Sequence, residues 1–190
     1  MSGTDRQRWD ARHAAAADVG PLPPDVLRGR EALVPVAGRA LDVACGRGAV
    51  ALWLARRGLA VDAVDVSVVA LAAAGRMSAD LNVRWWQQDL DAGLPPDCTG
   101  PYNLVVCQRF RDPALYPALA DALAPDGLLA ISVLSEVDEG PGPWRAPPGE
   151  LLAAFSHLDV LVHTEANGEA SLLGRLSPTP GSPPWRPPAS

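Results

Sequence analysis

The amino-acid sequence predicts an α/β fold, a Rossmann-like doubly wound sheet of about seven strands with helices on both faces. Short apolar runs alternate with amphipathic segments from residue 39 onward. A glycine loop, Gly46-Arg47-Gly48, follows the first of these runs and opens a helix. Near the carboxyl terminus, Asn167-Gly168 separates two strand-like runs, which is a strong hairpin signal. The sheet is therefore expected to be mostly parallel and to end in an antiparallel hairpin.

The expected helices and strands follow one another in a regular order. The first half is predicted to contain helices at 4–18, 25–33, 48–58 and 68–78 and strands at 39–44, 60–66 and 82–88. The second half is predicted to contain strands at 102–107, 128–134, 159–165 and 169–177, helices at 112–124 and 150–158, and a turn at 125–127. The long loop at 135–149 is of the kind that often covers an active site.

Length and composition restrict the function classes. The 190 residues suit a single domain, expected to span residues 1–177, and 48% of them are hydrophobic. The formal net charge of −6 argues against nucleic acid and against an anionic membrane as partners. The cysteines and histidines show no metal-ligand spacing, so no metal is expected. Without a secretory leader or a long apolar run, a cytoplasmic protein is expected. The Pro-rich tail at 178–190 is expected to be disordered.

The ends of the first three strands indicate a cofactor site. Gly46 and Gly48 let a ligand approach the backbone at a helix N-terminus. Asp65 ends the second strand, where a carboxylate can accept hydrogen bonds from both hydroxyl groups of a ribose. Asp89 and Leu90 follow the third strand and can bind an adenine edge, although Asp89 is also explained as a turn or helix cap. These residues indicate an adenosine-containing cofactor without choosing one.

Asp42, inside the strand before the loop, separates two cofactor classes. In a dinucleotide site this strand faces a pyrophosphate, which a carboxylate would repel. Beside a sulfonium and an α-amino group the same carboxylate is favourable, and S-adenosylmethionine carries both cations. The alternative interpretation is that Asp42 only accepts hydrogen bonds from amides of the loop itself. We predict S-adenosylmethionine as the cofactor.

Five quoted stretches carry a resemblance to a known family. "RALDVACGRGAVALWLARRGLAVDAVDVS" (39–67) is similar to the cofactor-binding half of class I S-adenosylmethionine-dependent methyltransferases. "QQDLDAGLP", "YNLVVCQRF" and "ALAPDGLLAIS" resemble later motifs of that superfamily in the right order. The opening "RWDARH" (8–13) resembles the start of the small bacterial tellurite-resistance-like branch. The resemblance runs from about residue 8 to 177 and identifies the superfamily, not the substrate.

The resemblance also implies a set of site residues and a cap at 1–35, helical and lying over the cofactor. The implied cofactor-binding residues are Asp42, Ala44, Cys45, Gly46 and Gly48 around the methionine part, Asp65 at the ribose, Val66, Asp89 and Leu90 beside the adenine, and Cys107 and Gln108 below the sulfonium. The chain departs from many relatives after the fourth strand. It reads Gln108-Arg109-Phe110-Arg111 where they carry a His or a Tyr.

The expected reaction is in-line transfer of the activated methyl group to a small-molecule acceptor, and much of it is alignment. A general base is needed only for an acceptor such as a hydroxyl, and His13 is the candidate; a solvent-facing histidine is the alternative interpretation. Arg109, with Arg111, can bind an anionic acceptor or form surface salt bridges instead. Trp144 can form part of a lid in the 135–149 loop, or it can simply be exposed.

Two other functions stay open at this point, together with the acceptor atom. One is an NAD(P)-dependent oxidoreductase, against which Asp42, Asp89 and the final hairpin argue. The other is a non-catalytic S-adenosylmethionine-binding protein, which the missing His or Tyr after the fourth strand keeps open. A monomer or a weak homodimer is expected. The acceptor is expected to be a hydroxyl of a sugar or lipid metabolite, a thiol, or a tellurite- or selenite-like oxyanion.

Overall fold

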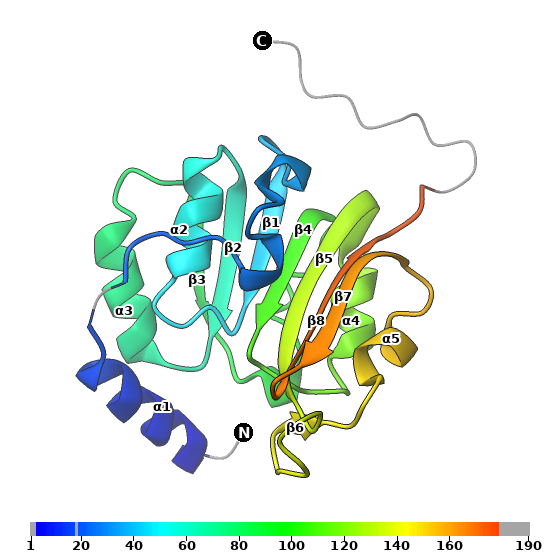
Figure 1. Ribbon diagram of the computed structural model, residues 1–190. Helices are drawn as coiled ribbons and strands as arrows, with labels where there is room; N and C mark the ends of the chain where they lie inside the picture. Colours follow the sequence, from blue (N-terminus) through cyan, green and yellow to red (C-terminus); the bar gives the residue numbers. More distant parts are fainter. Residues whose placement is uncertain (1–2, 18, 179–190) are drawn as a thin grey trace.

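One twisted sheet forms the centre of the protein (Figure 1), described by a computed structural model for residues 3–17 and 19–178. The strand order in these residues is β3-β2-β1-β4-β5-β8-β7, with β6 paired to β5. The strands are β1 (Arg39–Val43), β2 (Ala60–Asp65), β3 (Val83–Gln87), β4 (Tyr102–Gln108), β5 (Leu123–Ser135), β6 (Arg145–Ala146), β7 (Asp159–Ala166) and β8 (Glu169–Arg175). Because β8 runs antiparallel to β5 and β7 while the others are parallel, the predicted fold class is confirmed.

Helices cover both faces of the sheet. The described helical segments are α1 (Gly3–Ala15), α2 (Ala49–Arg56), α3 (Val68–Met77), α4 (Tyr116–Asp121) and α5 (Glu150–Ala154), with the 3₁₀ turns η1 (Asp25–Leu27), η2 (Glu31–Leu33) and η3 (Leu90–Ala92). Side chains alternate along β1, so that Ala40 packs in one apolar cluster with Leu54 of α2 and Leu41 packs in a second cluster with Leu119 of α4. The first strand therefore joins the two cores.

The predicted helix at 25–33 is wrong, because the segment forms the two short 3₁₀ turns η1 and η2 instead. Gly29 lies between them with a φ of +74°, in the left-handed region where a continuous right-handed helix cannot pass. Val26 and Leu27 are nevertheless buried, so the segment still packs on the sheet beside α2. The apolar pattern correctly predicts burial, but it does not produce a helix.

Two helices in the second half are shorter than predicted, and a predicted turn lies inside a strand. The helix expected at 112–124 is confined to α4, and the one expected at 150–158 ends at Ala154. Strand β5 begins at Leu123 and runs through the predicted turn at 125–127. Its pairing with β4 shifts register between Tyr102 and Leu104, and Asp126 has a φ of +63°. The residues that were predicted to form a turn therefore form a bulge, and the strand continues through it.

Local signals at three other positions are confirmed. Ser67 caps α3 by accepting a hydrogen bond from the N–H of Ala70 at 3.1 Å. Asn167 and Gly168, both with positive φ, join β7 to β8 as the hairpin signal predicted. A Cβ added to Gly58 would lie 2.6 Å from the carbonyl oxygen of Val36, so only glycine fits where α2 ends.

The loops that follow β1, β2, β4 and β5 lie at one edge of the sheet. Figure 1 places α1 and the segment around β6 at this same edge, at the bottom of the view. Ligands of open α/β sheets bind at the carboxyl ends of the strands. No helix among the described residues is long and apolar enough to span a membrane. Apart from Pro178, the expected tail lies outside the described residues.

The opposite edge contains a buried carboxylate, that of Asp62, with four donors. Arg39, Arg84, Trp86 and Tyr102 all donate hydrogen bonds to it, at 2.9 to 3.0 Å. Burial opposes ionisation, but these hydrogen bonds outweigh it and hold the pKa of Asp62 below its ordinary value. The carboxylate stabilises the folded state above the ordinary aspartate pKa of 3.8, and the contribution is lost as the pH falls below it.

The variant Asp62→Asn is expected to lower the free energy of unfolding by about 1–2 kcal/mol at pH 7, because charge-assisted hydrogen bonds become neutral ones. Urea denaturation measures the difference in the free energy of unfolding between the variant and the wild type. This difference should become smaller as the pH falls below 4. Asp80→Asn, at an exposed position, is the matched control and should leave stability unchanged. An equal loss at pH 7 and pH 3 would contradict an ionic origin.

Candidate active site

The loop between β1 and α2 is held in a conformation that requires glycine. Gly46 and Gly48 have φ values of +52° and +78°. A Cβ on Gly48 would lie 2.5 Å from the Trp85 ring, so this glycine allows α2 to begin close against its neighbours. A Cβ on Gly46 would instead meet His13 of α1 at 3.3 Å. The loop therefore contacts the core on one side and α1 on the other.

Asp65 holds the loop from the end of β2. One carboxylate oxygen accepts a hydrogen bond from the N–H of Gly46 at 2.8 Å, and the other accepts one from the N–H of Ser67 at 2.8 Å. Each oxygen retains a further lone pair, because a carboxylate can accept about four hydrogen bonds. Asp65 is buried, yet it lines a cavity beside the loop. It can therefore accept hydrogen bonds from a bound ligand there.

Asp42 lies beneath the loop and is 3% exposed. It accepts a hydrogen bond from the N–H of Ala51 in the first turn of α2, while its Oδ2 has no hydrogen-bond partner. Burial raises its pKa to about 8; the Ala51 N–H opposes this shift, and the nearby Asp65 charge adds to it. The alternative interpretation of Asp42 expected a bond from an amide of the loop itself, whereas this donor belongs to α2. The other oxygen, Oδ2, is a buried acceptor without a hydrogen-bond partner.

A cavity of about 250 Å³, which we call the glycine-loop cavity, lies between the loop and α1. Its lining contains eight of the predicted site residues: His13, Ala44, Gly46, Asp65, Val66, Leu90, Gln108 and Arg109. The remaining predicted residues do not line it: Asp42, Cys45, Gly48, Asp89 and Cys107. Leu90 and Val66 supply apolar surface, Asp65 a carboxylate and Gln108 an amide. The Gln108 side chain already accepts a hydrogen bond from the N–H of Asp25 at 2.8 Å.

Three of the residues that do not line the cavity have structural contacts instead. Asp89 caps the turn η3 by accepting from the N–H of Asp91 at 3.1 Å. Cys107 is buried in the apolar cluster beneath α4, and burial raises its pKa. Burial also raises the pKa of Cys45 well above its ordinary value. Both thiols therefore remain protonated, and among the described residues no group of side chains could hold a metal ion.

Polar contacts attach helix α1 to the start of α3 and to the glycine loop. Asp10 accepts a hydrogen bond from the Ser67 hydroxyl at 2.5 Å, and Arg47 donates to the carbonyl oxygen of His13 at 2.6 Å. The His13 ring stacks on Trp9, with 5.9 Å between ring centroids. Partial burial lowers the pKa of His13 below its ordinary 6.5, an effect that the Asp65 charge opposes. His13 is therefore a neutral imidazole at pH 7, able to accept a proton.

A second cavity of about 500 Å³ adjoins the first, and we call it the arginine cavity. It is lined by four arginines, Arg8, Arg12, Arg109 and Arg111, by two aspartates, Asp91 and Asp112, and by Trp9, Phe110, Pro113, Leu134 and Trp144. Four residues line both cavities: Trp9, Arg12, Arg109 and Phe110. A molecule in the arginine cavity therefore lies next to the glycine-loop cavity. Its size is within the range of small-molecule sites.

Two of the four arginines are fixed by glutamates. Arg111 makes a bidentate pair with Glu150, which also accepts a hydrogen bond from the hydroxyl of Tyr116 at 2.8 Å. Arg109 pairs with Glu169 at 2.7 Å, in an exposed position. The surface salt bridge that was the alternative interpretation of Arg109 is therefore present, and the same side chain lines both cavities.

The loop at 135–149 is fastened to the β7–β8 hairpin. Glu165 accepts hydrogen bonds from the Ser135 hydroxyl at 2.8 Å and from the N–H of Gly149 at 2.9 Å, at the two ends of the loop. Arg145 donates to the carbonyl oxygens of Ser135 and Gly168, at 2.7 and 3.2 Å. Trp144 remains 55% exposed on the wall of the arginine cavity. The loop supplies an aromatic wall, and these bonds oppose a large opening movement.

The sequence interpretation missed three residues of the glycine-loop cavity: Trp9, Arg12 and Phe110. A signal for the first two existed, because Arg8, Trp9, Arg12 and His13 recur at helical spacing and therefore share one face of α1. Nothing in the sequence said which way that face points, since this depends on the contact between Asp10 and Ser67. For Phe110, the sequence offered no indication of a place in the cavity other than its position after a strand.

Comparisons with known proteins agree with this geometry. Residues 40–127 match a family model described as a methyltransferase domain. TehB from Haemophilus influenzae superimposes with a TM-score of 0.70 at 19% identity, over 90% of this chain and 67% of that one. An S-adenosylmethionine-dependent methyltransferase from Clostridium acetobutylicum gives 0.63 at 15% identity, over 80% and 89%. The [4+2]-cyclase SpnF gives 0.70 at 16% identity, over 92% and 96%. No curated protein sequence gives a significant match.

These structural likenesses are all below 25% identity and establish the fold, which is that of class I methyltransferases. The family match covers residues 40–127, less than half of the chain, and is to a methyltransferase domain. The part of the chain that is similar to a methyltransferase domain thus contains the first strands of the sheet, the glycine loop and Asp65.

Proposed function

We propose that the protein transfers a methyl group from S-adenosylmethionine to a small molecule bound in the arginine cavity. The observation that carries the proposal is the pair of adjoining cavities, which share Trp9, Arg12, Arg109 and Phe110. One contains the glycine loop and Asp65, and the other has the size of a small-molecule site. A cytoplasmic location and a monomeric or weakly dimeric state belong to the same proposal.

The residues around the glycine-loop cavity fit the cofactor. Asp65 would hold the ribose, Val66 and Leu90 would lie beside the adenine, and the unpartnered Oδ2 of Asp42 would favour the cationic methionine part. When bound, the cofactor supplies a methyl carbon already activated by its sulfonium. The Asp42 assignment depends on its carboxyl becoming ionised beside that cation, because burial keeps it largely protonated otherwise.

The chain's own contribution is alignment, exclusion of water and proton removal. Trp9, Phe110 and Trp144 would cover the acceptor and keep water out of the arginine cavity. The residues that line both cavities, Trp9, Arg12, Arg109 and Phe110, would hold the acceptor beside the methyl group that the cofactor would supply. For a hydroxyl acceptor, the neutral His13 would take the released proton. A thiolate or an oxyanion would need no such base.

A panel of acceptors tests the proposal. Release of S-adenosylhomocysteine would be measured with a catechol, an alkyl alcohol, a thiol, selenite and tellurite as acceptors. Saturable S-adenosylmethionine binding and turnover with one class are expected. Binding of NAD(H) without binding of S-adenosylmethionine would overturn the proposal in favour of the oxidoreductase alternative.

A second candidate is a cofactor-binding protein that does not transfer the methyl group. The observation in its favour is the [4+2]-cyclase among the structural neighbours, because its name describes a different reaction on the same fold. Tight binding of S-adenosylhomocysteine without turnover of any acceptor would support this candidate. The family match favours methyl transfer.

The variant His13→Gln is expected to lower kcat for hydroxyl acceptors by about 100-fold, the lower range of general-base effects, and to leave S-adenosylhomocysteine affinity nearly unchanged. Because the base acts in its neutral form, wild-type kcat should fall as the pH drops below 6.5, and this acid limb should disappear in the variant. Steady-state kinetics against pH measures both effects. His157→Gln, at an exposed histidine outside both cavities, is the control. Full activity of His13→Gln would remove the base assignment.

A further inference from the structure

The walls of the arginine cavity combine flat aromatic surfaces with positive charge. Trp9 comes from α1, Phe110 from the segment after β4 and Trp144 from the loop before β6. Three separate parts of the chain thus place aromatic rings around one space, with Leu134 and Pro113 between them. Flat apolar walls of this kind favour a planar ligand, because aromatic rings bury large areas and stack at defined offsets.

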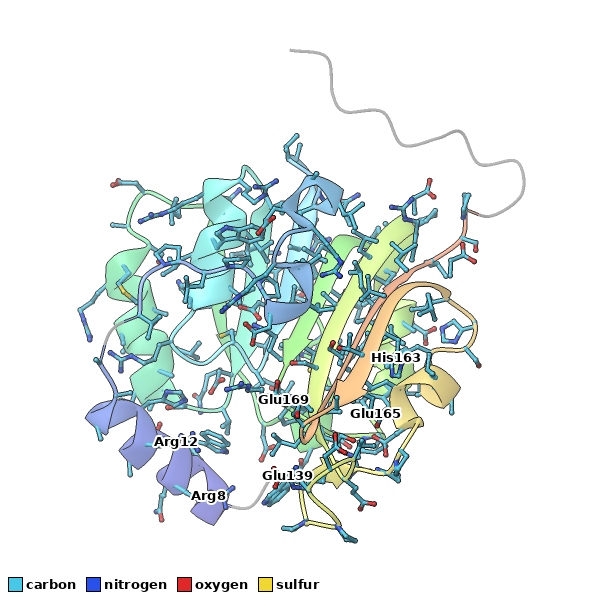
Figure 2. All side chains as sticks on the ribbon, in the orientation of Figure 1. Arg8, Arg12, Glu139, His163, Glu165 and Glu169 are labelled. Atoms are coloured by element: carbon cyan, nitrogen blue, oxygen red, sulfur yellow. The ribbon has the colours of Figure 1, made fainter. Side chains whose placement is uncertain are left out.

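Among the lining residues themselves arginines outnumber aspartates, and two of the arginines pair with Glu150 and Glu169, which lie outside the lining. Four arginines face two aspartates, and the Oδ1 of Asp112 already accepts a hydrogen bond from the N–H of Ala114 at 3.0 Å. Figure 2 shows Arg8 and Arg12 on α1 at the lower edge of the molecule, across from Glu139, Glu165 and Glu169. These three glutamates have partners of their own: Arg145 for Glu139, the Ser135 hydroxyl for Glu165 and Arg109 for Glu169.

Arg8 and Arg12 both lie against aromatic rings, and of these two only Arg12 also lines the glycine-loop cavity. Arg109 and Arg111 form ion pairs with glutamates, and the guanidinium of Arg8 lies 5.8 Å from the ring centroids of both Trp9 and Trp144. Arg12 has no ion pair among residues 3–17 and 19–178, and its guanidinium lies 5.2 Å from the Trp9 ring centroid. It lines both cavities, so it is a cation placed where donor and acceptor meet.

We propose that the methyl acceptor is a small planar anion, a molecule of the aromatic carboxylate class, whose negative group binds the Arg12 guanidinium while its ring lies against Trp9 and Trp144. This inference rests on the proposed function, since it assigns the acceptor of that reaction. A guanidinium binds a carboxylate through two parallel hydrogen bonds, which fixes the orientation of the ring. The anion also offsets the joint positive charge of Arg12 and a sulfonium donor, which would otherwise repel each other.

Binding to the protein loaded with S-adenosylhomocysteine tests the inference without requiring turnover. The probes are 4-hydroxybenzoate, its neutral amide, the non-planar cyclohexanecarboxylate and acetate, measured by calorimetry. We expect 4-hydroxybenzoate to bind at least 10-fold more tightly than each of the other three. We also expect its affinity to fall as the salt concentration rises. Equal affinity for the acid and its amide, or no binding of any probe at millimolar concentration, would overturn the inference.

Arginine variants identify the group that binds the anion. Arg12→Gln should remove the preference for the acid over the amide, and Arg12→Lys should keep part of it because the charge remains. Arg6→Gln removes an exposed arginine from the same helix outside both cavities and should keep the full preference. A full preference in a folded Arg12→Gln protein would overturn the role of Arg12.

The same experiments separate this inference from the proposed function. Each variant is first examined for thermal unfolding, which should match the wild type, and the probes are then compared at a saturating concentration of S-adenosylhomocysteine, so that a changed cofactor affinity does not enter the comparison. A wild-type protein that binds no S-adenosylhomocysteine would overturn the proposed function. A protein that binds S-adenosylhomocysteine but shows no preference for the planar acid would overturn the inference alone. Trp144→Ala should weaken 4-hydroxybenzoate binding and leave the affinity for acetate unchanged; equal loss for both probes would overturn the stacking role.

Discussion

Replacing Asp65 with alanine is expected to weaken S-adenosylhomocysteine binding by about 100-fold or more. The carboxylate lines the glycine-loop cavity with lone pairs still available for the two ribose hydroxyls. Hydrogen bonds to a charged group contribute about 1.5–3 kcal/mol each, so the loss of two corresponds to a change of this size. Calorimetric titration of the cofactor product against both proteins measures the effect.

The same variant also removes the acceptor for the N–H groups of Gly46 and Ser67, so part of the loss comes from a loosened loop. Asp65→Asn separates the two contributions, because the amide retains one oxygen acceptor and almost the same shape. We expect its affinity to lie between those of the wild type and the alanine variant, with a thermal stability close to the wild type. Unchanged affinity in a folded Asp65→Ala protein would refute the ribose assignment.

The glycine loop and Asp65 were predictable because they are local in sequence. A strand, a tight turn and a helix N-terminus leave few residue choices, and the pairing of Val43 with Val64 in neighbouring parallel strands places the ends of β1 and β2 together. The loop residues Ala44 and Gly46 and the strand-end residues Asp65 and Val66 accordingly line the cavity as a group.

The motif could not predict the direction in which each side chain points. Cys107 ends the predicted strand at the right height, but it points into the cluster that contains Leu119 of α4. Gly48 belongs to the glycine pattern because of packing against Trp85 and Ala74, not because it borders the cavity. A shared motif fixes where the backbone goes, whereas the alternation of side chains along each strand decides what a ligand meets.

The arginine cavity could not be predicted from the sequence, because contacts between distant segments create it. Helix α1 reaches the edge of the sheet through the bond between Asp10 and Ser67, 57 residues apart. The loop carrying Trp144 is held to the hairpin by Glu165, and Arg111 is fixed by Glu150. Polar contacts of this kind leave no periodic signature. The helix at 25–33 was wrong for a related reason, since the left-handed backbone at Gly29 is not visible as an apolar pattern.

Asp42→Asn is expected to stabilise the protein at neutral pH while weakening its affinity for S-adenosylmethionine. In the wild type, burial raises the pKa of Asp42 to about 8, above the ordinary value of 3.8. A carboxyl whose pKa is raised by folding contributes its full stability below 3.8 and loses it as the pH rises toward 8. Asparagine does not ionise and keeps an oxygen to accept from Ala51. The difference in the free energy of unfolding between the variant and the wild type should therefore grow from pH 4 to pH 8, by up to about 1.4 kcal/mol per pH unit.

Cofactor affinity then distinguishes the two roles considered for this residue. If the Oδ2 of Asp42 faces the cationic part of the ligand, binding favours the ionised carboxyl, and wild-type affinity should rise with pH up to about 8. The Asn variant should bind more weakly at pH 8 and show no such pH dependence. A greater loss for S-adenosylmethionine than for S-adenosylhomocysteine would place the carboxyl near the sulfonium, because the two ligands differ only by the methyl group and the positive charge that it gives the sulfur. If Asp42→Asn binds both ligands as tightly as the wild type at pH 8, then Asp42 only caps α2. Its carboxylate then does not determine which cofactor binds.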